Sequence, residues 1–269
     1  MTERTVLDFY RHEVDSPRSE HYAHWTPDGR RVLSTEQFFE RTAALADSLA
    51  ELGVEKGDRV MLLSDNRPEW HMVDLAALSL GAVDVPIYGT LTPEQIAYQV
   101  RDSGSKVAIV ENTEQMDKFL TVRRKCRDLE HLVQIEGPTE PKVLAFDDLL
   151  ETGDGCDAEA AFWDRAAAVD PGDLMTIIYT SGTTGEPKGV MLTHDNLVQN
   201  VLAACNRVTI EREGLALEFL PLCHVFERMF GYCYMYKEVT KAYCSVHHVG
   251  ELIKTIRPTL FAAVPRLYE

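Results

Sequence analysis

The chain has 269 residues, 45% hydrophobic and 26% charged, which is typical of a globular protein with room for about two domains. With 27 Lys and Arg residues and 43 Asp and Glu residues, its net charge is −16, which argues against nucleic acids and anionic lipid surfaces as partners. No apolar run approaches the roughly 20 residues that cross a bilayer, and the charged N-terminus lacks an apolar signal core.

The cysteines show no spacing typical of a metal site. Six cysteines, at positions 126, 156, 205, 223, 233 and 244, include no Cys-x-x-Cys pair. We therefore expect reduced, partly buried thiols in a cytoplasmic protein. The sequence leaves peripheral association with a membrane open.

The first half of the chain alternates between predicted strands and helices. Residues 1–20 form a polar arm or a first helix, and residues 21–34 a hairpin that turns at Pro27-Asp28-Gly29. A helix over 35–52 begins with a capping box of Ser34 and Gln37. Further strands are predicted at 59–63, 82–86, 106–110 and 132–135, and further helices at 68–81, 93–104 and 112–126.

Such alternation of apolar strands and helices indicates a parallel sheet covered on both faces. Residues 137–173 are richer in Gly, Pro and acidic residues, so we expect an irregular excursion with one short helix near Phe162. Beyond it, strands are predicted at 174–179, 216–220, 242–246 and 259–264, and helices at 194–206, 224–237 and 249–256.

The loop from Thr180 to Gly189 carries the strongest chemical signal. It reads TSGTTGEPKG and lies between a predicted strand and a predicted helix. Glycines let backbone N–H groups approach an anion, hydroxyls add donors, and Lys188 adds a mobile positive charge. The sequence therefore predicts a site for nucleotide phosphates. An ordinary Ser/Thr/Gly connection is the alternative.

The loop is not a Walker P-loop. That pattern has four residues between its two glycines, followed by Lys and then Ser or Thr. Here two residues separate Gly182 from Gly185, and Gly189 follows the lysine. The loop instead resembles the signature loop of the adenylate-forming superfamily, which includes acyl-CoA synthetases, adenylation domains of peptide synthetases and luciferases.

Two further stretches narrow this resemblance. Residues 220–229, LPLCHVFERM, and residues 66–92, which begin with NRPEW, are similar to the long-chain fatty acid–CoA ligase branch. The similarity runs from about Tyr22 to the end of the chain. It implies an α/β fold of two packed sheets with flanking helices.

The resemblance also implies a division of the chain. One subdomain would span 55–206 and contain the phosphate loop at 180–189, and a partial second one would combine 1–54 with 207–269. Family members are about twice as long as this chain. We therefore expect an N-terminal part whose partners include the missing C-terminal half of the same enzyme.

The implied reaction uses ATP, Mg²⁺ and coenzyme A. A fatty acid and ATP would form acyl-adenylate and pyrophosphate, and the thiol of coenzyme A would then displace AMP. Lys188 and His224 are the expected catalytic residues, and the Thr180 hydroxyl is expected to meet magnesium. The resemblance implies a nucleotide-binding set of Thr180, Ser181, Gly182, Thr183, Thr184, Gly185, Lys188 and Gly189.

The segment around His224 is predicted to continue as a helix. His224 and Arg228 are four residues apart, so they would share a helix face. Arg228 would neutralise a carboxylate or an adenylate, or pair with Glu227. The following side chains would line an acyl tunnel or belong to the core: Phe226, Met229, Phe230, Tyr232 and Tyr234.

Three functional hypotheses remain open at this stage. The chain is the N-terminal part of a long-chain fatty acid–CoA ligase and is inactive by itself. Alternatively, it is a non-catalytic domain with a structural or nucleotide-binding role. Thirdly, it belongs to an enzyme that adenylates another carboxylic acid, such as an aryl acid or an amino acid.

Overall fold

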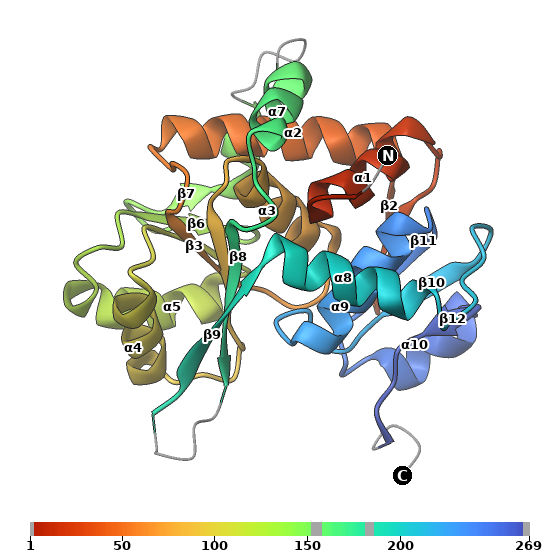
Figure 1. The fold of residues 1–269 in the computed structure, drawn as a ribbon. Coiled ribbons are helices and arrows are strands. Elements are labelled where there is room, and N and C mark those ends of the chain that lie inside the picture. Colours follow the sequence, from red (N-terminus) through yellow and green to blue (C-terminus); the bar gives the residue numbers. More distant parts are fainter. Residues whose placement is uncertain (1–2, 152–157, 181–185, 266–269) are drawn as a thin grey trace. The chain divides into compact units, whose positions relative to one another are not determined.

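The computed structural model describes residues 3–151, 158–180 and 186–265. It has two β-sheets with flanking helices, which confirms the predicted α/β class (Figure 1). The chain forms two compact units. Unit 1 comprises Met1–Phe39, Asp65–Pro68 and Asp195–Glu269, and unit 2 comprises Glu40–Ser64 and Glu69–His194. The division into 55–206 and 1–54 with 207–269 stays a prediction.

The helices of the described residues, labelled in Figure 1, are α1 (Val6–Asp15), α2 (Thr35–Glu51), α3 (Pro68–Ser79), α4 (Pro93–Ser103), α5 (Thr113–Val122), α6 (Phe146–Glu151), α7 (Ala158–Ala167), α8 (His194–Cys205), α9 (Val225–Tyr236) and α10 (Val249–Ile256), with a short 3-10 helix η1 (Arg123–Lys125). The strands are β1 (Tyr22–Thr26), β2 (Gly29–Leu33), β3 (Arg59–Leu63), β4 (Val83–Pro86), β5 (Val107–Val110), β6 (His131–Gln134), β7 (Leu144–Ala145), β8 (Leu174–Thr180), β9 (Lys188–Thr193), β10 (Leu215–Glu218), β11 (Thr240–Tyr243) and β12 (Leu260–Phe261). Within the described ranges, no helix has the length and apolar character that a bilayer crossing requires.

Unit 2 contains a sheet with the strand order β7-β6-β5-β3-β4-β8-β9. All neighbouring strands are parallel except β8 and β9, which are antiparallel. Met61 and Leu63 pack into a core with residues of α4 and α5. Val60 and Leu62 point to the opposite face, because side chains alternate along a strand, and they are also fully buried. The predicted parallel sheet with two covered faces is therefore confirmed in unit 2.

Short-range signals set the ends of several helices. Ser34 and Gln37 exchange the two hydrogen bonds of a capping box, as predicted. At α4, the Thr92 hydroxyl accepts the Gln95 N–H, and Gly104 ends the helix with φ 64° and ψ 39°. Glycine adopts this left-handed conformation without steric cost, so the predicted stop is confirmed.

The structure corrects two predictions made from sequence. The stretch 137–173 contains β7 and α6 in addition to α7, which is the short helix expected near Phe162. Residues 188–193 form strand β9, whereas the sequence indicated a loop through Gly189 and no strand before the helix predicted at 194–206. The apolar side chains of Val190, Met191 and Leu192 favour extended backbone once β8 supplies a pairing edge.

Unit 1 contains the sheet β12-β10-β11-β1-β2, in which only the β1–β2 hairpin is antiparallel. Leu217 packs with Val249 of α10 and Ala216 packs with Tyr234 of α9. Consecutive strand residues point to opposite faces, so α10 and α9 cover opposite faces of this sheet. The predicted 21–34 hairpin is confirmed.

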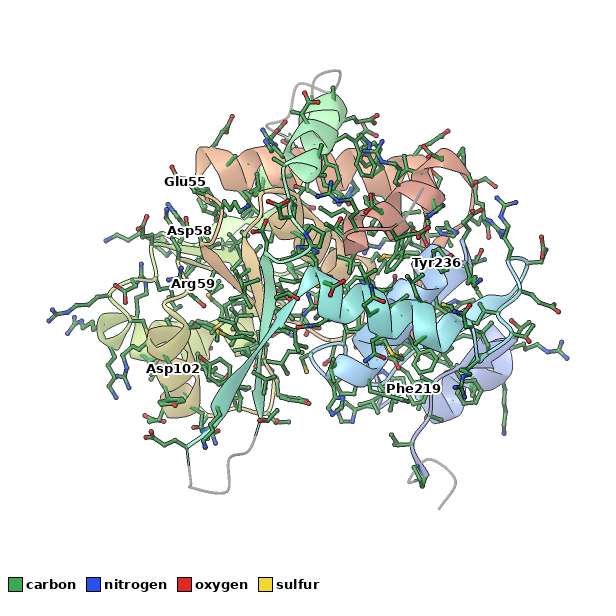
Figure 2. All side chains as sticks on the ribbon, viewed as in Figure 1. Glu55, Asp58, Arg59, Asp102, Phe219 and Tyr236 are labelled. Carbon is green, nitrogen blue, oxygen red and sulfur yellow. The ribbon has the colours of Figure 1, made fainter. Side chains whose placement is uncertain are left out.

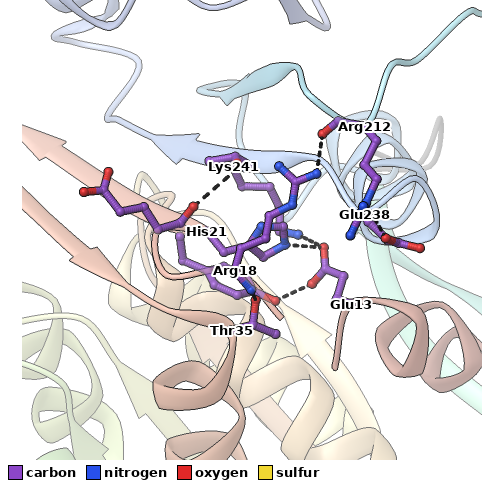
Figure 3. Close-up of polar contacts among 10 residues, drawn as sticks. Glu13, Arg18, His21, Thr35, Arg212, Glu238 and Lys241 are labelled. Atoms are coloured by element: carbon purple, nitrogen blue, oxygen red, sulfur yellow. Dashed lines mark hydrogen bonds and ion pairs between the residues drawn. The ribbon is translucent and has the colours of Figure 1, made fainter. Parts of the chain in front are cut away.

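A buried ionic cluster joins α1, β1 and β11 within unit 1 (Figure 3). The Glu13 carboxylate pairs with the Lys241 ammonium group, accepts a hydrogen bond from the Tyr22 hydroxyl and lies 3.0 Å from His21 Nε2. Burial alone would raise the pKa of Glu13, but Lys241 and His21 lower it to about 2. Burial also lowers the pKa of His21, with Lys241 adding to the effect. The cluster therefore holds a charged carboxylate between segments far apart in the chain.

Candidate functional site

Strands β8 and β9 form a hairpin (Figure 1). Predicted site residues lie at its loop end, where β8 ends and β9 begins. Thr180, the last residue of β8, pairs directly with Lys188, the first residue of β9. Opposite residues of an antiparallel ladder project to the same face, and both residues are exposed. A hydroxyl and an ammonium group therefore stand side by side where the loop leaves the hairpin.

The loop that these two residues enclose is described only in part. Five of its predicted phosphate-binding residues lie outside the described residues: Ser181, Gly182, Thr183, Thr184 and Gly185. Glu186 is exposed, and Pro187 is half-buried. Lys188 lies at a strand end, so its backbone is fixed by the ladder instead of belonging to the loop.

Gly189, the other predicted site residue on β9, has a steric reason to be glycine. A Cβ atom at this position would lie 2.7 Å from Ile177 Cγ2 and 3.5 Å from the ring of Tyr179. Ile177 and Tyr179 belong to the core that α4 and α5 cover. Gly189 thus lets two core side chains of β8 lie across β9, whereas Thr180 and Lys188 project from the opposite face.

Helix α4 anchors the hairpin on both strands. The Tyr98 hydroxyl donates a hydrogen bond to the Pro187 carbonyl, 3.0 Å away, directly before Lys188. The Tyr179 hydroxyl donates to Asp102 Oδ2 at 2.7 Å, directly before Thr180; Figure 2 labels Asp102. Burial, followed by the bond to Asp102, raises the pKa of Tyr179 well above its ordinary value, so the phenol remains a donor.

Sequence reasoning did not identify these anchors. Tyr98 and Asp102 are four residues apart on a helix that was predicted, which places them on one face. That spacing was the available signal. Nothing in the sequence indicated that this face would meet the hairpin, because the two contacts join residues 89 and 77 positions apart in the chain.

His224, the second predicted catalytic residue, belongs to unit 1 and is exposed. It is the N-cap of α9, and its Nδ1 accepts the Phe226 N–H at 3.2 Å. An accepting Nδ1 carries no proton, so the neutral imidazole has its proton on Nε2. Nε2–H is therefore the group that His224 can offer to a ligand.

His224 and Arg228, which were predicted to share a face of the helix, are not both accessible to a ligand. His224 is exposed, whereas Arg228 is fully buried, with Nε donating to the Tyr232 hydroxyl at 3.0 Å. The guanidinium carbon also lies 5.8 Å from the Tyr232 ring centroid. Val225 and Phe226 are exposed like the N-cap, and burial of α9 begins at Glu227, which the four-residue spacing did not reveal.

The aromatic residues of α9 divide between core and surface. Phe226, Phe230 and Tyr234 form a row with ring centroids 5.2 and 6.1 Å apart. Tyr234 is buried in a core cluster against which Phe230 packs, and Tyr232 is also buried. Phe226, at the other end of the row, is 39% exposed. Tyr232 and Tyr234 are thus core residues in this structure.

Thr180, the predicted magnesium ligand, provides a neutral hydroxyl oxygen. Across the described ranges, no group of three or more His, Cys, Asp or Glu side chains is arranged to hold a metal ion. Magnesium in proteins is often held by one or two carboxylates together with substrate phosphates. The Thr180 hydroxyl fits a magnesium ion only as one ligand among phosphate oxygens and water.

The structure thus brings together Thr180, Lys188 and Gly189 on one hairpin of unit 2. It places His224 in unit 1. The hairpin can present a positive charge, a hydroxyl and backbone groups to an anion, and the α9 N-cap can present an imidazole donor. These are the groups required for polyphosphate binding and for stabilising negative charge.

Comparison with known proteins identifies the family to which the chain belongs. Residues 11–269 match the family described as AMP-binding enzymes. The chain is 34% identical over 263 residues to the long-chain-fatty-acid–CoA ligase FadD15 of Mycobacterium bovis, covering 97% of this chain and 43% of that protein. It is 29% identical over 249 residues to the long-chain-fatty-acid–CoA ligase ACSBG2 of Xenopus laevis, covering 88% and 34%. The chain therefore spans less than half the length of these curated relatives.

Solved structures share the fold. A putative long-chain-fatty-acid CoA ligase from Rhodopseudomonas palustris has a TM-score of 0.80 at 22% identity, covering 97% of this chain and 63% of that one. The long-chain-fatty-acid–CoA ligase FadD1 from Archaeoglobus fulgidus has a TM-score of 0.79 at 21% identity, covering 95% and 50%. The resemblance to long-chain fatty acid–CoA ligases is confirmed, and the chain belongs to the AMP-binding enzyme family.

Proposed function

We propose that this chain is the ATP-phosphate-binding part of an enzyme that activates a long-chain fatty acid as its coenzyme A ester. The observation that carries the proposal is the pairing of Thr180 with Lys188 at the mouth of the β8–β9 hairpin. The sequence between them supplies hydroxyls and glycines. Thr180 and Lys188 would hold both ends of this donor-rich sequence near the phosphates of ATP.

Lys188 would act on the leaving group. When a carboxylate oxygen attacks the α-phosphorus, the bond to the β-phosphate oxygen breaks and negative charge collects on pyrophosphate. An ammonium group on a side chain whose backbone is fixed at a strand end would stabilise that charge. A charge-assisted hydrogen bond of this kind contributes about 1.5–3 kcal/mol.

Magnesium would enter this site with the nucleotide. A bound Mg²⁺ neutralises phosphate charge, and the Thr180 hydroxyl is the described group that would complete its oxygen shell. His224 would donate from Nε2–H to an oxygen of the acyl phosphate group, because its Nδ1 already caps α9. The thiol of coenzyme A would then attack the acyl carbon and release AMP.

The full reaction is proposed for a protein of the relatives' length, and nucleotide binding for this chain. The fatty acid as substrate is supported by the names of the curated relatives. With a net charge of −16, any peripheral contact of this chain with a membrane would have to be made by apolar side chains or local basic patches.

The proposal is tested in two steps. Isothermal titration calorimetry with Mg²⁺–ATP should detect binding to this chain, and the absence of binding would overturn the hairpin site. ATP–pyrophosphate exchange by a version extended to the relatives' length should then be stimulated by palmitate. Stimulation by benzoate or amino acids instead would assign another carboxylic acid, and exchange with none of these acids would favour a non-catalytic role.

A further inference from the structure

The segment Phe219–His224, which joins β10 to α9, is held by two side chains that sequence reasoning did not single out as functional. We propose that Asn66 and Glu227 are positioning residues that orient the imidazole of His224. The catalytic meaning of this orientation rests on the proposed function, whereas the orientation itself is a property of unit 1. All of these residues belong to that unit.

Asn66 clamps the middle of the segment. Its Nδ2 donates to the Leu220 carbonyl at 2.7 Å, and its Oδ1 accepts the Leu222 N–H at 3.1 Å. The side chain is buried, with 4% of the residue exposed. Only an amide of this length offers a donor and an acceptor in one planar group: aspartate lacks the donor, and leucine lacks both.

The residue before Asn66 is fixed as well. Asp65 Oδ2 accepts a hydrogen bond from the Ser245 hydroxyl at 3.0 Å. Ser245 follows β11, whereas Leu220 and Leu222 follow β10. The Asp65–Asn66 pair is therefore held by the connections after two neighbouring parallel strands, which limits how far Asn66 can move.

Glu227 clamps the start of the segment. This residue is 1% exposed, and its Oε1 accepts the Phe219 N–H at 3.2 Å; Figure 2 labels Phe219. Burial and the neighbouring Glu218 raise the pKa of Glu227 well above its ordinary value. Glu227 is thus a buried carboxyl group whose Oε1 holds the backbone N–H at the start of the segment.

These contacts close a ring that contains His224. Glu227 lies three residues after His224, in the first turn of α9, and it reaches back to the start of the segment. The His224 N–H donates to the Pro221 carbonyl at 2.9 Å, which forms a turn. His224 Nδ1 then caps the helix through the Phe226 N–H. The direction of Nε2–H is therefore set by bonds that do not involve Nε2.

The test follows His224 directly by ¹⁵N-histidine NMR in this chain. A His224→Gln variant assigns its signals among the nine histidines. The wild type should show an unprotonated Nδ1 and a protonated Nε2. Asn66→Leu and Glu227→Leu should shift this signal toward a mixture of tautomers, whereas Glu227→Gln, which keeps the acceptor oxygen, should leave it unchanged.

Amide hydrogen exchange gives a second measurement. The loss of one hydrogen bond of about 1.4 kcal/mol corresponds to a tenfold change, so we expect exchange of the Leu222 amide to accelerate about tenfold in Asn66→Leu. In Glu227→Leu, the Phe219 amide should respond similarly. Asn206→Leu and Glu213→Gln, at exposed positions of the same unit, are the matched controls and should change neither measurement.

Three outcomes decide the proposal. If the folded leucine variants keep the His224 tautomer and amide exchange of the wild type, the proposal is wrong. If Asn66→Leu does not fold, Asn66→Asp replaces it: loss of the donor to Leu220 should shift the His224 signal, and an unchanged signal overturns the proposal. Because no measurement uses ATP or an acid, a protein that fails to bind ATP can still confirm the positioning while losing the proposed function.

Discussion

Thr180 and Lys188 lie directly opposite each other at the loop end of the β8–β9 hairpin. Opposite Cα atoms in such a ladder are about 4.5–5.5 Å apart, so both ends of the 181–187 loop are held close together before any ligand arrives. The entropy of closing the loop is then lost during folding and not during binding. At the proposed phosphate site, this arrangement would lower the entropy cost of binding a compact anion such as a triphosphate.

Replacing Lys188 tests the charge at this site. Lys188→Ala should weaken ATP binding by about 10- to 150-fold, the equivalent of about 1.5–3 kcal/mol for a charge-assisted hydrogen bond. Isothermal titration calorimetry measures the effect. Lys125→Ala removes an exposed charge from the same unit and is the control. Equal affinities for Lys188→Ala and wild type would remove Lys188 from the site.

Tyr98 tests whether α4 positions the loop. Tyr98→Phe loses the hydrogen bond to the Pro187 carbonyl, which contributes about 0.5–1.5 kcal/mol. We expect a several-fold loss of ATP affinity with a small change in melting temperature, because the ring remains in place. A variant with wild-type affinity would show that this anchor does not matter for the nucleotide.

Gly189 tests the packing of the hairpin. Gly189→Ala places a Cβ atom 2.7 Å from Ile177 Cγ2, and overpacking of this kind costs about 1–3 kcal/mol. Urea denaturation should report that loss. Gly172→Ala is the control, because its added Cβ meets nothing within 4 Å. In the Ile177→Ala background, the Gly189→Ala substitution should cost less, and full additivity of the two substitutions would argue against the contact.

Lys241 tests the buried ionic cluster. Lys241→Met leaves the Glu13 carboxylate buried without its ammonium partner, which should cost about 3–5 kcal/mol of the free energy of unfolding of unit 1. Adding Glu13→Gln removes the isolated charge and should restore part of that loss. Lys254→Met, on the exposed surface of α10, should change stability by less than about 0.5 kcal/mol.

The same cluster predicts how stability depends on pH. The pKa of Glu13 is about 2 in the folded chain, compared with an ordinary value of 4.5 that we take for the unfolded chain. As the pH falls, Glu13 is therefore protonated in the unfolded chain before it is protonated in the folded chain. The advantage of the wild type over Glu13→Gln should be complete above pH 4.5 and shrink as the pH falls toward 2. Separately, the lowered pKa of His21 should make the stability of the wild type itself fall as the pH drops below 6.5, because the unfolded chain then binds the proton more readily. Thermal melting across this range measures the difference, and a constant difference would contradict the assignment.

Sequence alone was sufficient where structure depends on residues close along the chain. The 35–52 helix was predicted from its capping box and observed at Thr35–Glu51. The stop of α4 at Gly104 followed from the left-handed conformation that glycine adopts easily. Such signals involve neighbours within about four residues, so they remain readable without knowledge of the fold.

Sequence reasoning failed where an element depends on a distant partner. Strand β9 is a strand because β8 supplies its hydrogen-bonding edge, and the Gly-rich composition before it indicated only a loop. Strand β7 and helix α6 lie in a stretch whose Gly, Pro and acidic residues suggested irregular chain apart from the short helix predicted near Phe162. In both places the tertiary context overrode the local composition.

The sequence by itself determined the alternation of strands and helices and the resemblance to adenylate-forming enzymes, and it is the source of the phosphate-site prediction. Only the tertiary structure decided which side chains meet: Thr180 with Lys188, Asn66 with Leu222 at a separation of 156 residues, and Glu13 with Lys241 at a separation of 228. The physical reason is that motifs and caps act over a few residues, whereas these pairs form only when strands from distant parts of the chain enter one sheet or one loop cluster.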